Sequence, residues 1–199
     1  MNSSLPVENQ EPIHTSALHL SVRVAVISAL LMLIPFTFSL FSVEMDWSPF
    51  DYILIWTLLF FTGLTYSFIT RNSIDTIYRL AVGLAVVSGL MLTWANLAVG
   101  LIGSEDNPIN LSYMFILALG ILVSFFVRFK AMMMTIIMVK MAFLLLVVGV
   151  VALFMDMHLL PHSSVTQIIG VTGFFMLPML VSAILFYQAH IDQQKASQF

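Results

Sequence analysis

Six apolar segments, each long enough to cross a lipid bilayer, dominate this chain of 199 residues. They cover residues 24–43, 52–69, 78–103, 109–127, 131–155 and 165–187. A bilayer's hydrocarbon layer is about 30 Å thick and is crossed by roughly 20 helical residues, or about 17 at the low end. Lipid offers no partners to backbone polar groups, and these segments lack the alternating pattern of barrel strands. We therefore predict an all-α, polytopic membrane bundle of six transmembrane helices.

The composition supports a membrane protein and excludes several other classes. Hydrophobic residues make up 60% of the chain and charged residues 9%, whereas a soluble domain carries about 25% charged residues. The net charge of -3 provides no basic face for nucleic acid. Cysteine is absent, which excludes disulfides, thiolate metal sites and cysteine nucleophiles. Motifs for nucleotide binding or catalysis are missing, and so are histidine pairs for haem, so the cofactor stays unknown.

Apart from Lys140, the basic residues all fall on one side of the predicted bundle. They are Arg23, Arg71, Arg79, Arg128, Lys130 and Lys195. The opposite side receives carboxylates and histidines, namely Glu44, Asp46, Asp51, Glu105, Asp106, Asp156, His158 and His162. Because Lys and Arg are retained on the cytoplasmic side of a membrane, we predict that both termini are cytoplasmic. Residues 1–18 and 191–199 are then polar cytoplasmic tails of a transmembrane domain that covers residues 19–190.

Lys140 is the one charged residue far from the ends of an apolar segment. If that segment covers 131–155, a lysine ten residues after Lys130 lies about 15 Å along the helix, near mid-membrane. A charge at this depth costs several kcal/mol, so we expect the ammonium group to face the bundle interior. Asn96, Tyr66 or Ser88 would accept its hydrogen bonds. The alternative is that the side chain extends to the membrane surface.

The fifth segment has a second register, and the loop after it carries metal-binding residue types. A helix over 141–160 would place Asp156 and His158 in the membrane, so we prefer the earlier boundaries. In the loop, Asp156, His158 and His162 offer carboxylate and imidazole ligands that suit zinc or copper. Pro161 interrupts any helix that would align the two histidines, and a wet interfacial loop without metal is the alternative.

The stretch LIGSEDNPIN, residues 101–110, is the most polar window between the flanks of the chain. Asn107 followed by Pro108 is typical of a helix N-cap and first helical residue. Glu105 and Asp106 would then lie beside the positive end of the helix dipole. A solvent-exposed turn that starts a helix needs residues of these types, so a purely structural role explains the composition of this stretch.

A functional interpretation of the same stretch adds polar and aromatic residues of the neighbouring segments. Trp94 and Asn96 lie one to two helical turns before the loop, and Tyr113 follows it. Together they would form a polar funnel that leads inward from the acidic loop. The candidate binding residues are therefore Asp51, Trp94, Asn96, Glu105, Asp106, Asn107, Asn110 and Lys140.

Three segments of the chain resemble a family of uncharacterised small bacterial integral-membrane proteins. They are PFDYILIWTLLFFTGLTY, IYRLAVGLA and WANLAVGLIGSEDNPINLSY. In that family a W-x-N-L-A-V-G-x-I-G-S-E-D-N-P-x-N-L-x-Y segment joins two helices. The resemblance covers residues 48–128, and it implies a bacterial inner membrane without implying an activity.

Two classes of function remain. One is a small transporter, channel or solute-binding membrane subunit whose outward mouth is lined by Asp51, Asn96, Glu105 and Asp106, since an acidic mouth concentrates cations. The other is a structural or accessory subunit whose acidic rim docks onto a larger membrane complex. An enzyme ranks third, because no catalytic set can be assembled. The lipid bilayer is the expected partner, and a homo-oligomer stays open.

Overall fold

The computed structural model describes residues 17–41, 47–161 and 163–197, and their fold is entirely helical. The helices are α1 (Ala17–Phe41), α2 (Pro49–Thr70), α3 (Thr76–Ala98), α4 (Asn110–Phe126), α5 (Ala131–Phe154) and α6 (Val165–Ala196), with a short 3-10 turn, η1, at Met157–Leu159. Within these ranges five helices are long and apolar enough to cross a membrane, and α4, with 17 residues, is shorter. The all-helical prediction is confirmed, and the chain is a multi-pass membrane protein.

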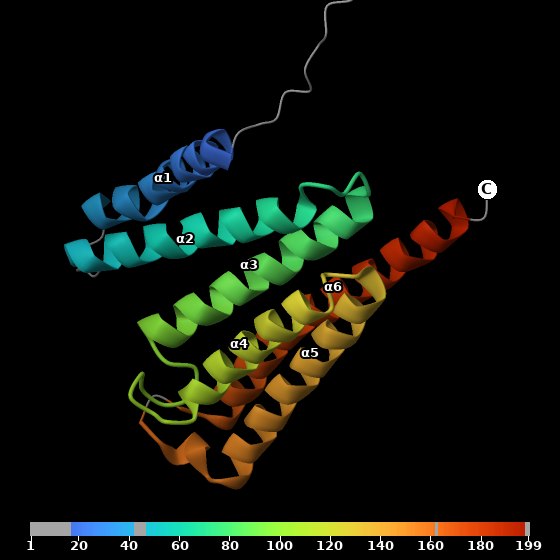
Figure 1. The fold of residues 1–199 in the computed structure, drawn as a ribbon. Helices are drawn as coiled ribbons and strands as arrows, with labels where there is room; N and C mark the ends of the chain where they lie inside the picture. Colours follow the sequence, from blue (N-terminus) through green and yellow to red (C-terminus); the bar gives the residue numbers. More distant parts are fainter. Residues whose placement is uncertain (1–16, 42–46, 162, 198–199) are drawn as a thin grey trace, which may run out of the picture.

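The helices form a hairpin laid against a four-helix group (Figure 1). In the group, α6 packs on α5 and α3, and α4 packs on α5. In the hairpin, α1 packs on α2, which in turn contacts α3. Consecutive helices run in opposite directions, so their ends collect at two ends of the molecule. We call the end where α2, α4 and α6 begin the acidic end, and the end where α3 and α5 begin the basic end.

Small residues allow close helix packing in the core. A Cβ atom at Gly149 of α5 would collide with Thr172 of α6, and one at Gly120 of α4 would collide with Met141 of α5. The fully buried Ala81 of α3 brings that helix against α6. There the hydroxyl of Ser182 donates a 2.9 Å hydrogen bond to the carbonyl of Ala81. These contacts make α3, α5 and α6 the rigid centre of the fold.

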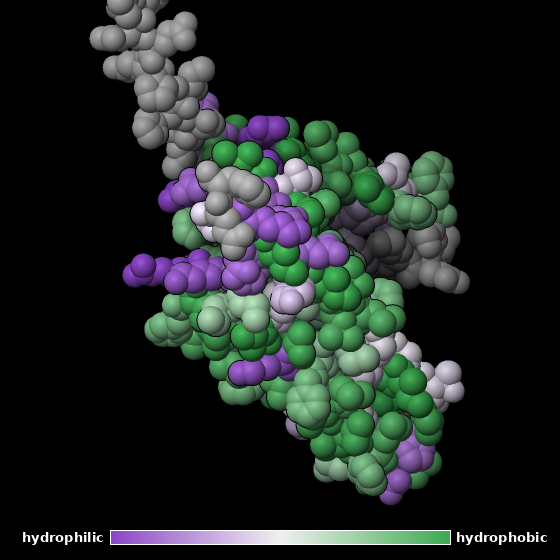
Figure 2. Space-filling model, turned by 90° about the vertical axis from the view of Figure 1, so that its right-hand side faces the viewer, coloured by the Kyte–Doolittle hydropathy of each residue, from purple (hydrophilic) through white to green (hydrophobic). Residues whose placement is uncertain are grey.

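The outer surface is strongly apolar. Figure 2 shows a broad hydrophobic surface, with hydrophilic atoms gathered toward one part of the molecule. Phe38 of α1, Phe115 of α4 and Phe143 of α5 are each more than 60% exposed. Soluble monomers rarely expose apolar patches larger than a few hundred Å². A surface of this kind is stable in contact with lipid.

Two helix boundaries at the acidic end differ from the sequence prediction. Helix α3 ends at Ala98, whereas the apolar segment continues to residue 103. The chain turns at Gly100 and Gly103, both with a φ of 70°. Leu101 and Ile102 between them are buried, which shows that the segment is apolar because it folds back into the bundle.

Helix α4 begins later than predicted. Its N-cap is Ile109, which makes no side-chain cap, and the predicted cap residue Asn107 lies before it. The amide NH of Ile109 donates a 3.3 Å hydrogen bond to Asn107 Oδ1, so Asn107 closes a turn rather than the helix. The amide NH groups of Asn110 and Leu111 bond to carbonyls three residues earlier, which continues the turn into α4.

The later helices keep the predicted starts. Helix α5 ends at Phe154, as the earlier register of the fifth segment required, and η1 interrupts the alternative helix over 141–160. Helix α6 continues to Ala196, past residue 187 and through most of the predicted C-terminal tail.

Candidate functional site

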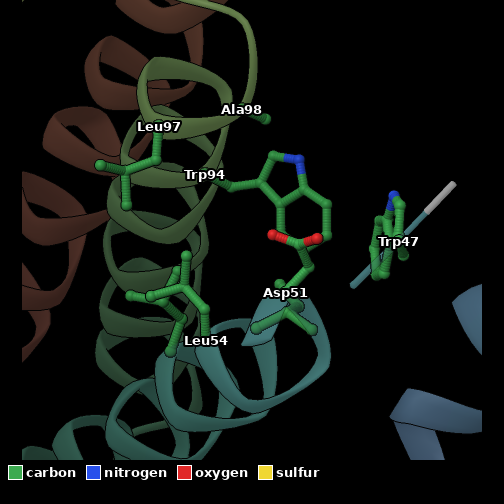
Figure 3. Close-up of a pocket in the computed structure, with 8 residues that line it drawn as sticks. Trp47, Asp51, Leu54, Trp94, Leu97 and Ala98 are labelled. Atoms are coloured by element: carbon green, nitrogen blue, oxygen red, sulfur yellow. The ribbon is translucent and has the colours of Figure 1, made fainter. Parts of the chain in front are cut away.

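A pocket of about 280 Å³ lies between α2 and α3 at the acidic end (Figure 3). It is lined by Trp47, Asp51, Leu54, Ile55, Leu58, Trp94, Leu97 and Ala98. Among these described lining residues Asp51 alone carries a charge. The pocket therefore combines one carboxylate with aliphatic and aromatic walls.

Asp51 is held in place by the way α2 begins. Ser48 is the N-cap, Pro49 follows it, and Asp51 completes a capping box. The backbone NH and the hydroxyl of Ser48 each donate a 2.8 Å hydrogen bond to Asp51 Oδ2. Within the described chain no hydrogen bond is formed by Asp51 Oδ1. The capping box thus fixes the carboxylate and leaves one oxygen available to a ligand.

Aromatic rings surround this carboxylate. The rings of Trp47 and Trp94 lie 5.3 Å apart between centroids, and Trp47 also packs edge-on against Tyr52 at 5.3 Å. Tyr52 donates a 2.7 Å hydrogen bond from its hydroxyl to Ser39 Oγ, which ties the start of α2 to α1. Figure 3 shows the carboxylate of Asp51 pointing toward the indole of Trp94, with Trp47 across the pocket. A carboxylate that shares a pocket with two indole rings suits a cation that also has an apolar body.

No known protein offers a guide to this pocket. Neither a family model, nor a curated protein, nor a solved structure matches the chain. The resemblance of residues 48–128 to small bacterial membrane proteins stays a prediction. The chemistry of the pocket has to be understood from its own residues.

Sequence reasoning identified Asp51 and Trp94 but missed Trp47. The structure brings the first two together in one pocket, although they are far apart in the chain. Trp47 stands directly before the N-cap of α2, at the kind of interfacial position where tryptophan is enriched in membrane proteins. This position, directly before the capping sequence SPFD, is the signal that would have identified Trp47 as a candidate site residue.

The structure does not bring Trp94, Asn96 and Tyr113 of the predicted polar funnel together in one pocket. Trp94 faces α2, whereas Asn96 and Tyr113 are buried and do not line the pocket. Residues two apart on a helix with 3.6 residues per turn point to nearly opposite sides, so one funnel cannot contain both residues of α3. Asn96 Oδ1 has no hydrogen-bond partner within the described ranges, and the Tyr113 hydroxyl lies beside the side chain of Thr172.

The two asparagines of the acidic loop hold the α3–α4 connection together. Asn110 Oδ1 accepts hydrogen bonds from the NH groups of Leu101 and Ile102, at 3.1 and 3.0 Å. Asn110 Nδ2 donates to the carbonyls of Ile102 and Ser104, at 3.3 and 2.8 Å. Asn107 Nδ2 donates to the carbonyl of Ile102 at 3.1 Å. Both residues therefore stabilise the turn, whereas the non-functional interpretation of the loop gives Asn107 the role of helix N-cap.

Glu105 and Asp106 project from this turn. Both side chains are exposed, and neither lines the pocket beside Asp51. In the described chain neither makes an ion pair. They add negative charge to the acidic end, outside the pocket beside Asp51.

Lys140 lies on the exposed surface of α5 and does not face the bundle as predicted. Helix α5 packs through its other side, where Ile137, Met141 and Leu145 are buried. Ser88, one of the expected partners, donates its hydroxyl to the carbonyl of Leu84 in its own helix at 2.6 Å. The packing side of α5 was decided by its apolar residues, so the lysine lies outside.

The predicted metal ligands lie in the α5–α6 connection. Asp156 is exposed and has a φ of 53°, and His158 is half-buried with a buried Nδ1 that has no partner among described residues. His162 lies outside the described residues. Within the parts of the chain that are described, no three His, Asp or Glu side chains come together. The metal site stays a prediction.

Proposed function

We propose that the protein is a small transporter or solute-binding membrane subunit that receives a cationic solute at the acidic end of the bundle. One observation carries the proposal: Asp51 offers a fixed carboxylate in the same pocket of about 280 Å³ as the packed indole rings of Trp47 and Trp94. A volume near the lower end of the usual range of about 300 to 1,000 Å³ suits a small organic cation.

Cation–π attraction and charge pairing act together in such a pocket. A cation over an indole face gains about 0.5 to 1 kcal/mol at an exposed site and about 2 kcal/mol when it is desolvated. Leu54, Leu97 and Ala98 supply an apolar wall that favours an alkylated ammonium group over a hydrated metal ion. Glu105 and Asp106 raise the local concentration of cations at the same end.

The proposed topology places the pocket on the side away from the cytoplasm. Arg71, Arg79, Arg128 and Lys130 lie at the ends of helices that meet at the basic end, and basic connections are retained in the cytoplasm. We include α4 as a sixth span, since its 17 residues reach the low end of about 17 needed to cross the hydrocarbon layer. The proposed location is a bacterial inner membrane, with both termini cytoplasmic.

Uptake by reconstituted vesicles separates a transporter from a binding subunit. Proteoliposomes of the wild-type protein would be given radiolabelled tetramethylammonium, and the label trapped inside would be counted. A transporter accumulates label faster than protein-free vesicles, and Asp51→Asn lowers the rate several-fold. Asp192→Asn is the matched control, because it removes an exposed carboxylate of α6 that does not line the pocket. Binding without uptake would indicate a solute-binding subunit and not a transporter.

An accessory subunit of a larger membrane complex is the second candidate, and Lys140 is the observation that favours it. An exposed ammonium group about 15 Å along α5 is costly in lipid, and a partner helix with a carboxylate would neutralise it. The test is the size of the complex extracted from native membranes with mild detergent. An accessory subunit migrates in a larger complex that Lys140→Leu disrupts and Lys140→Arg preserves.

A further inference from the structure

A groove of about 570 Å³ opens on the surface between α2 and α4, in the half of the bundle next to the basic end. Its walls come from the second halves of α2 and α4, and α3 lies between them. Its floor includes Met134, Met138 and Met141 of α5 and Met179 of α6. The groove therefore reaches from the lipid-facing surface to the central helices.

Small residues allow the helices that line the groove to pack closely. Gly89 of α3 lines the groove, and a Cβ atom there would lie 3.2 Å from Leu117 of α4. Gly120 of α4 leaves no room for a side chain above Met141, whose thioether lies directly beneath it. Because methionine side chains are flexible and polarizable, such a floor adapts to a long flexible ligand.

The walls offer a ligand almost no polar contact. Thr93 donates its hydroxyl to the carbonyl of Gly89 at 2.8 Å, and Ser124 donates to the carbonyl of Gly120 at 2.7 Å. These hydroxyls are satisfied within their own helices. Most other lining residues are aliphatic, aromatic or methionine side chains, so the groove suits hydrocarbon.

The mouth of the groove at the basic end is positively charged. The guanidinium of Arg71 lies 5.3 Å from the ring centroid of Phe68, which lines the groove. Arg128 is exposed and directly precedes Phe129, another lining residue. In the described parts of the chain neither arginine makes an ion pair. Both cations are free to bind an anion at the mouth.

The nearby carboxylate of Asp75 does not cancel this charge by pairing with an arginine. Asp75 Oδ1 accepts hydrogen bonds from the NH groups of Ile77 and Tyr78, at 2.8 and 3.2 Å, and so caps α3. Its other oxygen is buried. The carboxylate is directed into the fold, while the arginines stay at the surface.

The turn beside Arg128 is held in an uncommon conformation. Arg128 and Phe129 have φ values of 55° and 54°, in the left-handed region that side chains other than glycine rarely adopt. The hydroxyl of Tyr78 donates a 2.7 Å hydrogen bond to the carbonyl of Phe129 and fixes this turn to α3. This hydrogen bond therefore fixes the position of Arg128 relative to the end of the groove.

We propose that the groove binds an acyl chain of an anionic phospholipid, whose phosphate lies at Arg71 and Arg128. From Leu58 to Ile69 the α2 wall is about 17 Å long, close to one leaflet of a hydrocarbon layer about 30 Å thick. An acyl chain spans this length, and its headgroup reaches the basic mouth.

This lipid site is separate from the pocket beside Asp51 and does not depend on the proposed transport function. Its first test is lipid selectivity. The wild-type protein would be reconstituted in vesicles of equimolar phosphatidylglycerol and phosphatidylcholine, extracted in mild detergent, and analysed by native mass spectrometry. We expect retained phosphatidylglycerol to exceed phosphatidylcholine several-fold. Equal retention of the two lipids would overturn the proposal.

Charge variants locate the headgroup. Arg71→Gln with Arg128→Gln should bring the ratio of the two retained lipids close to one. Arg23→Gln is the matched control, because it removes an exposed cation of α1 that does not border the groove, and it should leave the ratio unchanged. An unchanged ratio in the double variant, or an equal fall in the control, contradicts the headgroup position.

Groove variants locate the acyl chain. Thr65 is exposed on the α2 wall, so Thr65→Phe fills the groove without entering the packed core. We expect it to lower the retention of phosphatidylglycerol several-fold. Ala118→Phe adds the same ring to an exposed position of α4 outside the groove and should have no effect. If Thr65→Phe retains as much lipid as the wild type, the groove does not hold the chain.

Discussion

The side chain of Asn110 and the backbone of Ile102 form two hydrogen bonds with each other across the α3–α4 connection. Asn110 Oδ1 accepts from the NH of Ile102 at 3.0 Å, and Asn110 Nδ2 donates to its carbonyl at 3.3 Å. Ile102 is fully buried. The pair therefore satisfies backbone polar groups at a point where the chain leaves helix α3 and folds back into an apolar core.

Replacement of Asn110 should destabilise the protein more than any other change in this loop. Asn110→Ala removes four hydrogen bonds and leaves buried backbone groups unpaired, each at a cost of about 1 to 3 kcal/mol. Asn107→Ala removes fewer bonds. We expect the thermal unfolding temperature in detergent to fall most for Asn110→Ala, less for Asn107→Ala, and little for Glu105→Gln with Asp106→Asn. An equal effect of all three would contradict the assigned roles.

Gly100 is required by both backbone conformation and space. Its φ is 70°, and a Cβ atom there would lie 2.7 Å from backbone atoms of Ser104 and Glu105. Gly100→Ala should lower the unfolding temperature strongly. Gly170 of α6 is the control, since nothing lies within 4 Å of the corresponding Cβ position. Gly170→Ala should stabilise the helix by about 0.5 to 1 kcal/mol.

The hydrogen bond between Tyr78 and Phe129 gives a smaller, local prediction. Tyr78→Phe removes the hydroxyl and leaves the carbonyl of Phe129 without that donor, which should cost about 1 kcal/mol. Tyr187 is exposed on α6, and Tyr187→Phe should be neutral. Hydrogen exchange of residues 127–130 measures the effect, and faster exchange in Tyr78→Phe alone is expected. Unchanged exchange would show that the turn does not depend on the hydroxyl.

Hydrophobicity and the spacing of apolar runs predicted the helices well, because lipid forces each backbone segment to satisfy its own hydrogen bonds. The fold-back of Leu101 and Ile102 could not be predicted in this way. Buried loop residues and helical residues are equally apolar, and only the partner Asn110 distinguishes them. The capping pattern around Asp51 was present in the sequence. The position of Asp51 in the same pocket as Trp94 depends on how α2 packs on α3, which the sequence does not specify.

The exposed position of Lys140 could not be predicted from the sequence either. The cost of a charge in lipid predicted an inward lysine, but it did not specify which face of α5 is covered. That face was decided by residues such as Met138, Ala142 and Leu145, which are buried between helices.

The proposed topology predicts the location of reporter domains fused along the chain. Fusions after residues 46, 106 and 160 should report the side away from the cytoplasm. Fusions after residues 74 and 130 and at the C-terminus should report the cytoplasm. Paired reporters that are active on opposite sides provide the measurement and its control. A cytoplasmic signal after residue 106 would reverse the orientation and place the pocket of Asp51 inside the cell.

We propose that Asp51, Trp47 and Trp94 bind an organic cation. Tryptophan fluorescence is the most direct test of this binding. The chain has three tryptophans, and Trp56→Phe leaves only the two that line the pocket. This variant would be titrated with choline and with 3,3-dimethylbutanol, which has the same shape but no charge.

We expect a saturable fluorescence change with choline, and none with the neutral alcohol at the same concentration. Added Asp51→Asn should weaken choline binding at least ten-fold, whereas added Asp192→Asn, which removes an exposed carboxylate outside the pocket, should leave it within two-fold. Equal responses to choline and the alcohol, or an unchanged choline affinity in Asp51→Asn, would contradict the cation site.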